Sequence, residues 1–172
     1  MKQVSCDRSY AGPILEILNE AIVNSTALWD YEPRTLAMMG PWFDAKEAGK
    51  FPVVGFVDES NQLLAFGSYG TFRACPAYKY TVEHSLYVER SHRGRGLGTR
   101  MLQQLISLAE EQGYHNMIGG IATENEASVK THLKCGFEPC GTIRHCGYKF
   151  QNWIDLSFYQ RLLSGPRNPV DG

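Results

Sequence analysis

The sequence of 172 residues predicts an α+β fold with three layers, in which helices cover a mixed central sheet on both sides. Apolar residues recur at helical spacing in some segments, whereas β-branched and aromatic residues gather in short runs in others. A glycine-rich turn joins one of these runs directly to a helical segment. About seven strands are expected, over residues 2–6, 51–57, 63–69, 81–88, 118–122, 140–150 and 152–162. About four helices are expected, over residues 10–24, 35–49, 97–113 and 125–135.

The N-terminal part contains the first two helices and an irregular segment between them. Ile14, Ile17 and Ile22 belong to the apolar face of the first helix, and Thr35 can cap the second. Residues 27–35 carry aromatic side chains, acids and an Arg, but they have neither helical nor strand periodicity. Such a loop either lines a binding site or covers the core with its aromatic rings, and both interpretations stay open.

A hairpin follows, because the polar residues 58–61 separate two apolar runs. The second run extends toward Arg73, and residues 74–78 form a loop that leads to the central strand. In that strand, residues 81–88, β-branched or apolar side chains alternate with polar ones, which is typical of a half-buried strand. These strands are therefore expected to form a meander that ends in the central strand.

Directly after the central strand, the turn Arg93-Gly94-Arg95-Gly96-Leu97-Gly98 opens a helix. The first N–H groups of a helix lack internal partners and attract anions, so this turn suits a ligand with phosphate groups. A Walker loop would end in Gly-Lys-Ser/Thr, but here Thr99 and Arg100 follow the last glycine. A dinucleotide fingerprint has more widely spaced glycines. A glycine turn without a ligand is the simpler alternative, and the downstream sequence argues against it.

A second motif lies downstream of this turn. The apolar residues 118–122 are followed by Asn125 and Ser128, and the helix that begins here is stopped by Gly136 and Phe137. Together, the two motifs resemble those of the GCN5-related N-acetyltransferases, in which the glycine loop binds the pyrophosphate of acyl-CoA. Two linked motifs at this separation are far more specific than one loop.

Acetyl transfer from a thioester to an amine requires a neutral nitrogen nucleophile and a polarised carbonyl. Glu83 is the candidate general base, because it lies in the central strand and partial burial raises the pKa of a carboxylate. Pairing with Arg73 or binding of the substrate ammonium are its alternative roles. His132 is the candidate general acid for the thiol leaving group, at a place where many members of the superfamily carry a Tyr, and a histidine with only a packing role is the alternative.

From about residue 27 to about residue 162, the chain is similar to the phosphinothricin, methionine sulfone and methionine sulfoximine N-acetyltransferases, and the Trp153-Ile154-Asp155 segment shares in this similarity. The resemblance implies that backbone groups of Leu86, Tyr87 and Val88 bind the pantetheine arm. It implies coenzyme contacts at Arg93, Gly94, Arg95, Gly96, Leu97, Gly98, Thr99, Asn125 and Ser128. It implies amino acid contacts at Arg73, Ala74, Cys75, Tyr78, Glu83, His84 and Ser85. The guanidinium of Arg73 can bind a substrate carboxylate bidentately.

The amino-acid composition limits which binding partners and which cellular compartment are expected. Lys and Arg number 17 and Asp and Glu 18, so nothing favours nucleic acid or a membrane surface as a partner. An odd number of cysteines after a short polar N terminus predicts a reducing, cytoplasmic compartment. No metal is expected, because the cluster of Cys135, Cys140, His145 and Cys146 contains no Cys-x-x-Cys pair. We expect one domain over residues 1–163, a flexible tail over 164–172 and, from the resemblance, a homodimer.

The leading hypothesis is therefore a cytoplasmic enzyme that uses acetyl-CoA to acetylate the α-amine of a small amino acid analogue by direct transfer. Phosphinothricin, methionine sulfone and methionine sulfoximine are the expected acceptors. One alternative is another acceptor, namely a protein N-terminus, a polyamine or an antibiotic amine. The other alternative is a non-catalytic acyl-CoA-binding module, against which the presence of both Glu83 and His132 argues.

Overall fold

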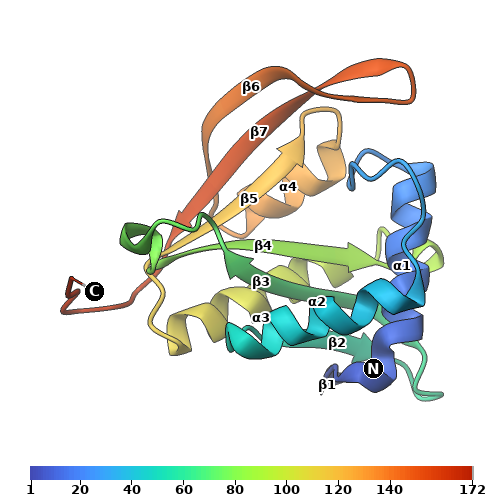
Figure 1. Cartoon of the computed structure of the whole chain (residues 1–172), viewed down its shortest axis with the longest axis horizontal. Coiled ribbons are helices and arrows are strands. Elements are labelled where there is room, and N and C mark those ends of the chain that lie inside the picture. The colour runs from blue at the N-terminus through green and yellow to red at the C-terminus, as the bar shows by residue number, and fades with distance from the viewer. Residues whose placement is uncertain (172) are drawn as a thin grey trace.

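The computed structural model describes residues 1–171 and contains the expected mixed sheet with helices on both faces (Figure 1). Its seven strands are hydrogen-bonded in the order β1-β2-β3-β4-β5-β7-β6. They are β1 (Lys2–Ser5), β2 (Val53–Val57), β3 (Leu63–Thr71), β4 (Thr81–Val88), β5 (Asn116–Ala122), β6 (Glu138–Lys149) and β7 (Asn152–Leu162). The helices are α1 (Ala11–Asn24), α2 (Leu36–Ala48), α3 (Leu97–Glu111) and α4 (Glu126–Lys134). The predicted fold class is confirmed.

The central feature of the sheet is a short parallel pairing between β4 and β5. The other neighbouring strands are antiparallel along most of their length, but β4 and β5 pair only from Thr81 opposite Asn116 to Glu83 opposite Ile118. Beyond Glu83 the two strands diverge (Figure 1). Some backbone N–H and C=O groups of β4 beyond Glu83 therefore have no hydrogen-bond partner within the sheet.

Two hydrophobic cores hold the helices on the sheet. Helices α1 and α2 lie on one face and α3 on the other (Figure 1). The core beneath α3 includes Met101, Leu102, Leu105, Val82 and Phe137. The core beneath α1 and α2 includes Ile14, Phe43, Phe66 and the partly buried Tyr87. The apolar spacing of α1 and α3 thus becomes a buried stripe, as the sequence predicted, whereas α2 buries Met39 and Phe43 and leaves Leu36 exposed.

Alternation along β4 decides which face each of its side chains reaches. Val82 packs into the core beneath α3, and the ring of His84 contacts Phe137 of that same core. Because successive side chains of a strand point to opposite faces, Glu83 and Tyr87 are directed to the other side. Neighbouring residues of β4 consequently serve different sides of the sheet.

At the C-terminal end, β6 and β7 form a long hairpin that extends beyond β5 (Figure 1). Residues 164–171 form no helix or strand, although His115 Nδ1 lies 2.8 Å from the Gly165 carbonyl and the Val170 amide donates to Tyr80. The expected flexibility of residues 164–172 stays a prediction, and Gly172 lies outside the described residues. None of the helices within residues 1–171 combines the length and apolar character needed to cross a membrane.

Candidate active site

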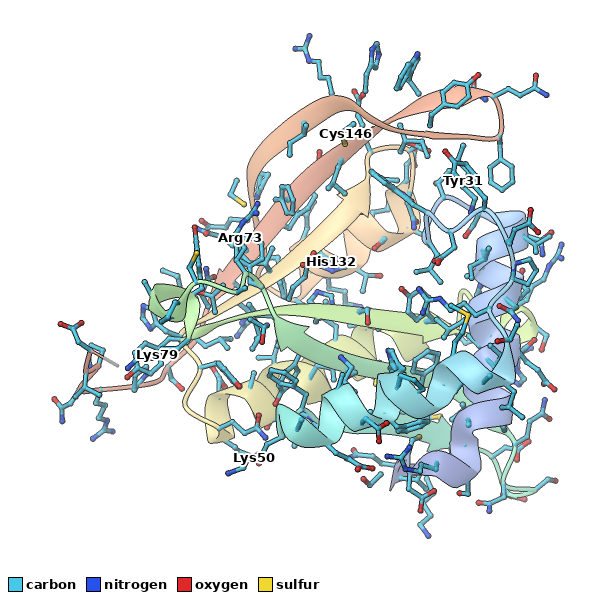
Figure 2. All side chains as sticks on the ribbon, in the orientation of Figure 1. Tyr31, Lys50, Arg73, Lys79, His132 and Cys146 are labelled. Atoms are coloured by element: carbon cyan, nitrogen blue, oxygen red, sulfur yellow. The ribbon has the colours of Figure 1, made fainter. Side chains whose placement is uncertain are left out.

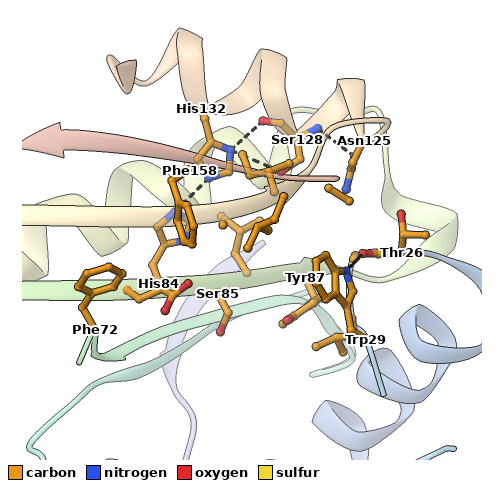
Figure 3. Close-up of a pocket in the computed structure, with 18 of the residues that line it drawn as sticks. Thr26, Trp29, Phe72, His84, Ser85, Tyr87, Asn125, Ser128, His132 and Phe158 are labelled. Carbon is orange, nitrogen blue, oxygen red and sulfur yellow. Dashed lines mark hydrogen bonds between the residues drawn. The ribbon is translucent and has the colours of Figure 1, made fainter. Parts of the chain in front are cut away.

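Two adjoining cavities open where β4 and β5 separate. The first, here called the inner cavity, has a volume of about 440 Å³ (Figure 3). It is lined by Thr26, Ala27, Leu28, Trp29, Phe72, Arg73, Glu83, His84, Ser85, Leu86, Tyr87, Gly120, Ile121, Ala122, Asn125, Ser128, His132, Leu156 and Phe158. The second, the loop cavity, follows the glycine loop and has a volume of about 850 Å³. Both cavities are lined by Thr26, Ala27, Leu86, Tyr87, Asn125, Ser128 and His132, so they meet along these residues.

The two cavities gather most, but not all, of the residues expected at the site. Arg73, Glu83, His84, Ser85 and His132 line the inner cavity. Leu86, Tyr87, Val88, Arg93, Gly94, Gly96, Leu97, Gly98, Thr99, Asn125 and Ser128 line the loop cavity. Arg95, Ala74, Cys75 and Tyr78 line neither of them. The last three belong to an exposed connection that contains a short 3₁₀ turn, Pro76–Tyr78, which the sequence pattern did not predict.

Glu83 presents its carboxylate toward β5. A Cβ atom on Gly120 would lie 3.3 Å from Oε1 of Glu83, so the absence of a side chain there leaves room for the carboxylate. Burial raises the pKa of Glu83, and the nearby positive charge of Arg73 partly counteracts this rise. A carboxylate with a raised pKa is a stronger base than an exposed one, which suits it to accept a proton from an ammonium group.

His84 and His132 form a buried pair at the wall of the inner cavity (Figure 3). Their Nε2 atoms are 3.0 Å apart, and their rings stack with centroids 5.0 Å apart. His132 Nδ1 lies 2.7 Å from the Ser128 carbonyl, which can only accept a hydrogen bond. His132 therefore carries its hydrogen on Nδ1, and its Nε2 accepts a hydrogen bond from Nε2–H of His84.

The environment keeps this pair neutral. Burial and, to a smaller extent, the neighbouring His132 together lower the pKa of His84 to about 3. Burial also lowers the pKa of His132, although the hydrogen bond to Ser128 partly offsets the effect. His84 lines the inner cavity and is hydrogen-bonded to His132, and its expected contact with a substrate stays a prediction.

Gly119 makes room for the two rings. A Cβ atom at this position would lie 2.9 Å from Nε2 of both His84 and His132. Gly119 and Gly120 were not among the residues expected at the site, although glycines inside an apolar strand often mark a close approach of other groups. That pattern was the available signal for both positions.

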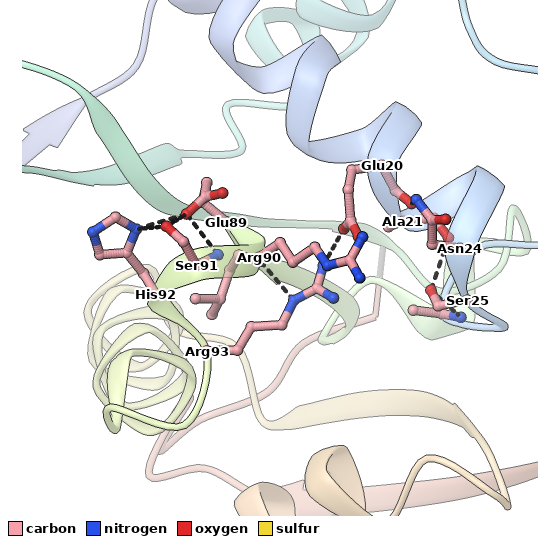
Figure 4. A network of polar contacts seen from close by, with 11 residues as sticks. Glu20, Ala21, Asn24, Ser25, Glu89, Arg90, Ser91, His92 and Arg93 are labelled. Carbon is pink, nitrogen blue, oxygen red and sulfur yellow. Dashed lines mark hydrogen bonds and ion pairs between the residues drawn. The ribbon is translucent and has the colours of Figure 1, made fainter.

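The glycine loop has the backbone geometry of an anion site. Gly94 and Gly96 have φ angles of 75° and 78°, a region that favours glycine, and α3 begins directly afterwards. The first N–H groups of α3 face the loop without partners inside the helix. Arg93 is bound by the carboxylate of Glu20 and donates from Nε to the Val88 carbonyl at 3.1 Å (Figure 4). Its guanidinium is therefore already engaged on the side of α1.

Asn125 and Ser128 form the start of α4. The side-chain oxygen of Asn125 accepts a hydrogen bond from the Ser128 amide at 3.2 Å, which caps the helix (Figure 3). The cap fixes the beginning of the helix that carries His132. Asn125 also lines both cavities, so it lies where it can contact a bound ligand.

The segment between α1 and α2 forms part of the site, whereas the sequence alone left its role open. Residues 26–29 line the inner cavity, which agrees with the binding interpretation of this loop. Leu156 and Phe158 of β7 complete the wall and were not expected. Within residues 1–171, no group of three or more His, Cys, Asp or Glu side chains is arranged to hold a metal ion.

The sheet opens between β4 and β5, and a glycine loop leads from β4 into α3. This arrangement defines an acyltransferase of the GCN5-related class that the sequence resembles. The acetyltransferase (GNAT) family model matches residues 15–137, and the chain belongs to this family. It is 41% identical over 155 residues to the L-methionine sulfoximine/L-methionine sulfone acetyltransferase of Pseudomonas paraeruginosa, covering 90% of each chain.

Solved structures agree with this assignment. A protein from Acinetobacter baylyi ADP1 is 48% identical and superposes with a TM-score of 0.98, over 99% of this chain and 97% of the other. The phosphinothricin acetyltransferase of Sinorhizobium meliloti, solved in complex with acetyl-CoA, is 28% identical with a TM-score of 0.94, over 99% and 94% of the two chains.

Proposed function

We propose that the chain transfers the acetyl group of acetyl-CoA to the α-amine of a small amino acid analogue of the methionine sulfone, methionine sulfoximine or phosphinothricin kind. The observation that carries this proposal is the opening of the sheet beyond Glu83, where two adjoining cavities meet. The names of the relatives from Pseudomonas paraeruginosa and Sinorhizobium meliloti support the acceptor class and the acetyl donor.

The donor is proposed to lie in the loop cavity. Backbone N–H groups from Arg93 to Thr99 would bind the pyrophosphate, because a helix N-terminus preceded by glycines favours anions. Of the expected residues Leu86, Tyr87 and Val88, the backbone groups of Leu86 and Val88 face away from β3 into the gap left by β5, and they would bind the pantetheine arm and polarise the thioester carbonyl. Tyr87 pairs with Phe66 of β3. Asn125 and Ser128 would contact the same arm from α4.

The acceptor is proposed to lie in the inner cavity, with its carboxylate or acidic group near Arg73 and its amine near Glu83. An α-ammonium group must lose a proton before it can attack, and Glu83 would accept that proton. The neutral nitrogen then forms a bond to the thioester carbon, giving a tetrahedral intermediate that collapses with cleavage of the C–S bond. One of the two protons then on nitrogen is lost, which leaves a neutral amide with one N–H, and the thiolate of CoA is protonated.

His132 is proposed to supply the proton to the thiolate. It lines both cavities, which supports a position between the acceptor and the leaving group. In the free protein both of its nitrogens are hydrogen-bonded, to His84 and to the Ser128 carbonyl, so delivery of a proton requires the exchange of one of these bonds. The variant His132→Asn should lower kcat without weakening acetyl-CoA binding, and an unchanged kcat would remove His132 from this role.

We also propose that residues 1–163 act as one domain, that two copies form a homodimer and that the protein works in the cytoplasm. Half or more of the surface of Ile143, Phe150 and Trp153 on the β6–β7 hairpin is exposed, which supports association through this hairpin. All five cysteines are free thiols, as in a reducing compartment. Light scattering of the purified protein tests the dimer, and Trp153→Glu should shift it toward the monomer.

The function is tested by measuring CoA release with a panel of amines and identifying the products by mass spectrometry. Methionine sulfone, methionine sulfoximine and phosphinothricin should be acetylated at the α-amine, and spermidine and a short peptide should be poor acceptors. Turnover of the peptide or of spermidine alone would move the proposal to another acceptor class. Tight binding of acetyl-CoA without turnover of any amine would favour a non-catalytic module.

A further inference from the structure

Lys149 is a buried cation whose partners all lie in one distant segment. It is the last residue of β6 and is only 4% exposed, whereas the preceding Tyr148 is 48% exposed. Its ammonium nitrogen lies 2.5 Å from the carbonyl oxygen of Ile22, 3.0 Å from that of Ser25 and 2.6 Å from that of Leu28. Three donors thus meet three backbone acceptors.

Two of these acceptors are groups that a helix end leaves unsatisfied. Ile22 lies in the last turn of α1 and Ser25 is its C-cap, and such carbonyls have no partner inside the helix. The end of a helix also carries partial negative charge, which a buried ammonium compensates. The path of the chain from α1 to Leu28 therefore bends around the Lys149 side chain.

Two neighbours of Lys149 hold the same segment. A Cβ atom on Gly147 would lie 2.7 Å from the ring of Trp29, so this ring packs directly on the glycine backbone. The hydroxyl of Tyr31 donates to the Tyr148 carbonyl at 2.9 Å, and Figure 2 shows Tyr31 beside the β6–β7 hairpin. Three consecutive residues of β6, Gly147, Tyr148 and Lys149, therefore hold residues 22–31 in place.

The fastened segment is part of the wall of the inner cavity. Thr26, Ala27, Leu28 and Trp29 all line that cavity, and Lys149 does not. We propose that Lys149 is a positioning residue, which shapes the acceptor site by holding residues 25–29 against the end of β6. This inference rests on the proposed placement of the acceptor in the inner cavity.

The variant Lys149→Met tests the inference, because it keeps the unbranched stem and removes the ammonium. The KM for methionine sulfone should rise about tenfold or more, since a shift of about 1 Å in a site wall is enough for such losses. The affinity for acetyl-CoA should fall by a smaller factor than the KM rises. Leu28 and Trp29 line the inner cavity alone, and although Ser25, Thr26 and Ala27 line the loop cavity, the glycine loop proposed to bind the pyrophosphate does not contact Lys149. If Lys149 only stabilised the fold, Lys149→Met would lower the stability and would affect the KM for methionine sulfone and the affinity for acetyl-CoA to the same extent.

Lys46→Met is the matched control. Lys46 also donates to a buried backbone carbonyl, that of Tyr69 at 2.8 Å, but it lines neither cavity. The control should lower thermal stability without raising KM for the acceptor. Equal acceptor KM values in folded Lys149→Met and in the wild type would overturn the inference.

Hydrogen exchange of residues 23–32 provides a readout that needs no acceptor. Exchange should be faster in Lys149→Met than in the wild type and in Lys46→Met, and unchanged exchange would overturn the holding role even if the proposed acceptor class is wrong. A wild type that acetylates no amine would instead overturn the proposed function. Should Lys149→Met not fold, Lys149→Gln keeps an amide donor and is expected to show the same separation of KM from acetyl-CoA affinity, to a smaller degree.

Discussion

His84 and His132 share one hydrogen bond in the interior of the protein, with their Nε2 atoms 3.0 Å apart. The Ser128 carbonyl holds the hydrogen of His132 on Nδ1, so the proton between the two rings comes from His84. Nδ1 of His84 is buried without a hydrogen-bond partner among the described residues. A proton added to this nitrogen would also have no acceptor, so the surroundings favour the neutral form of the pair.

The first prediction concerns stability at acidic pH. Because the folded pKa of both rings lies below the usual 6.5, the unfolded chain binds more protons below pH 6.5. The stability that the neutral pair provides is present above pH 6.5 and is lost as the pH falls toward the folded pKa, which is about 3 for His84. Each histidine should contribute up to about 1.4 kcal/mol per pH unit to this loss.

Urea unfolding of the wild type and of His84→Gln between about pH 7 and about pH 5 measures this effect. The free energy of unfolding should depend less steeply on pH in the variant, whatever its absolute stability. The exposed His145 supplies the control, since His145→Gln should keep the slope of the wild type. Equal slopes in wild type and His84→Gln would show that the pair does not stay neutral on folding.

The second prediction concerns the space at Gly119. In Gly119→Ala the added methyl group would approach both Nε2 atoms to 2.9 Å, so the rings must move apart. We expect a loss of about 1–3 kcal/mol in stability, together with a lower kcat if His132 has the proposed role. Thermal or urea unfolding and steady-state kinetics measure both quantities.

Gly40→Ala is the control for this substitution. Gly40 lies within α2, and a Cβ atom there meets nothing within 4 Å. Because Pro41 follows and disfavours a Cβ on the preceding helical residue, alanine should not stabilise the helix as it would elsewhere. It should change the stability by no more than about 1 kcal/mol and leave kcat unchanged. A Gly119→Ala variant that is as stable and active as the wild type would mean that the close approach of the two rings is not needed.

The third prediction concerns Arg73 and the pH dependence of catalysis. Arg73 lowers the pKa of Glu83, against the larger effect of burial, so Arg73→Gln should raise that pKa further. The acidic limb of the profile of kcat/KM against pH should then move to higher pH, because Glu83 must be deprotonated to act as base. The KM for methionine sulfone should rise as well, since a carboxylate partner is lost.

Lys79→Gln controls for a general change of charge, because Lys79 is exposed in the same connection and lines neither cavity. It should leave both the acidic limb and KM as they are. If the acidic limb of the kcat/KM profile lies at the same pH in Arg73→Gln and in the wild type, Arg73 does not lower the pKa of Glu83.

The periodic elements could be predicted from sequence, because helical and strand spacing report directly on a buried stripe or face. The glycine loop and the start of α4 could also be predicted, since the residues that form each lie close together in the chain. The partnership of His84 and His132 could not, because it depends on which face of β4 each residue reaches and on how α4 packs. The role of Lys149 could not be predicted either, because its partners lie more than a hundred residues away in the sequence.

The contacts expected at Ala74, Cys75 and Tyr78 illustrate the same limit. They came from resemblance, and the local chain folds into an exposed 3₁₀ turn whose Tyr78 ring packs edge-on against Phe72 at 5.6 Å. Their contact with an amino acid stays a prediction. Sequence patterns describe elements well, but they do not fix how a connecting segment lies against a cavity.

The central claim is that Glu83, at the point where the sheet opens, removes the proton that keeps the amine from attacking. Single-turnover acetyl transfer to methionine sulfone, measured for Glu83→Gln and for the wild type at about pH 7 to 9, tests it most directly. We predict a rate lower by about 10²–10⁴ at neutral pH, a smaller difference at high pH where the amine is already neutral, and unchanged acetyl-CoA affinity. A rate within a few-fold of the wild type at neutral pH, with acetyl-CoA bound equally well, would contradict the assignment of Glu83 as the base.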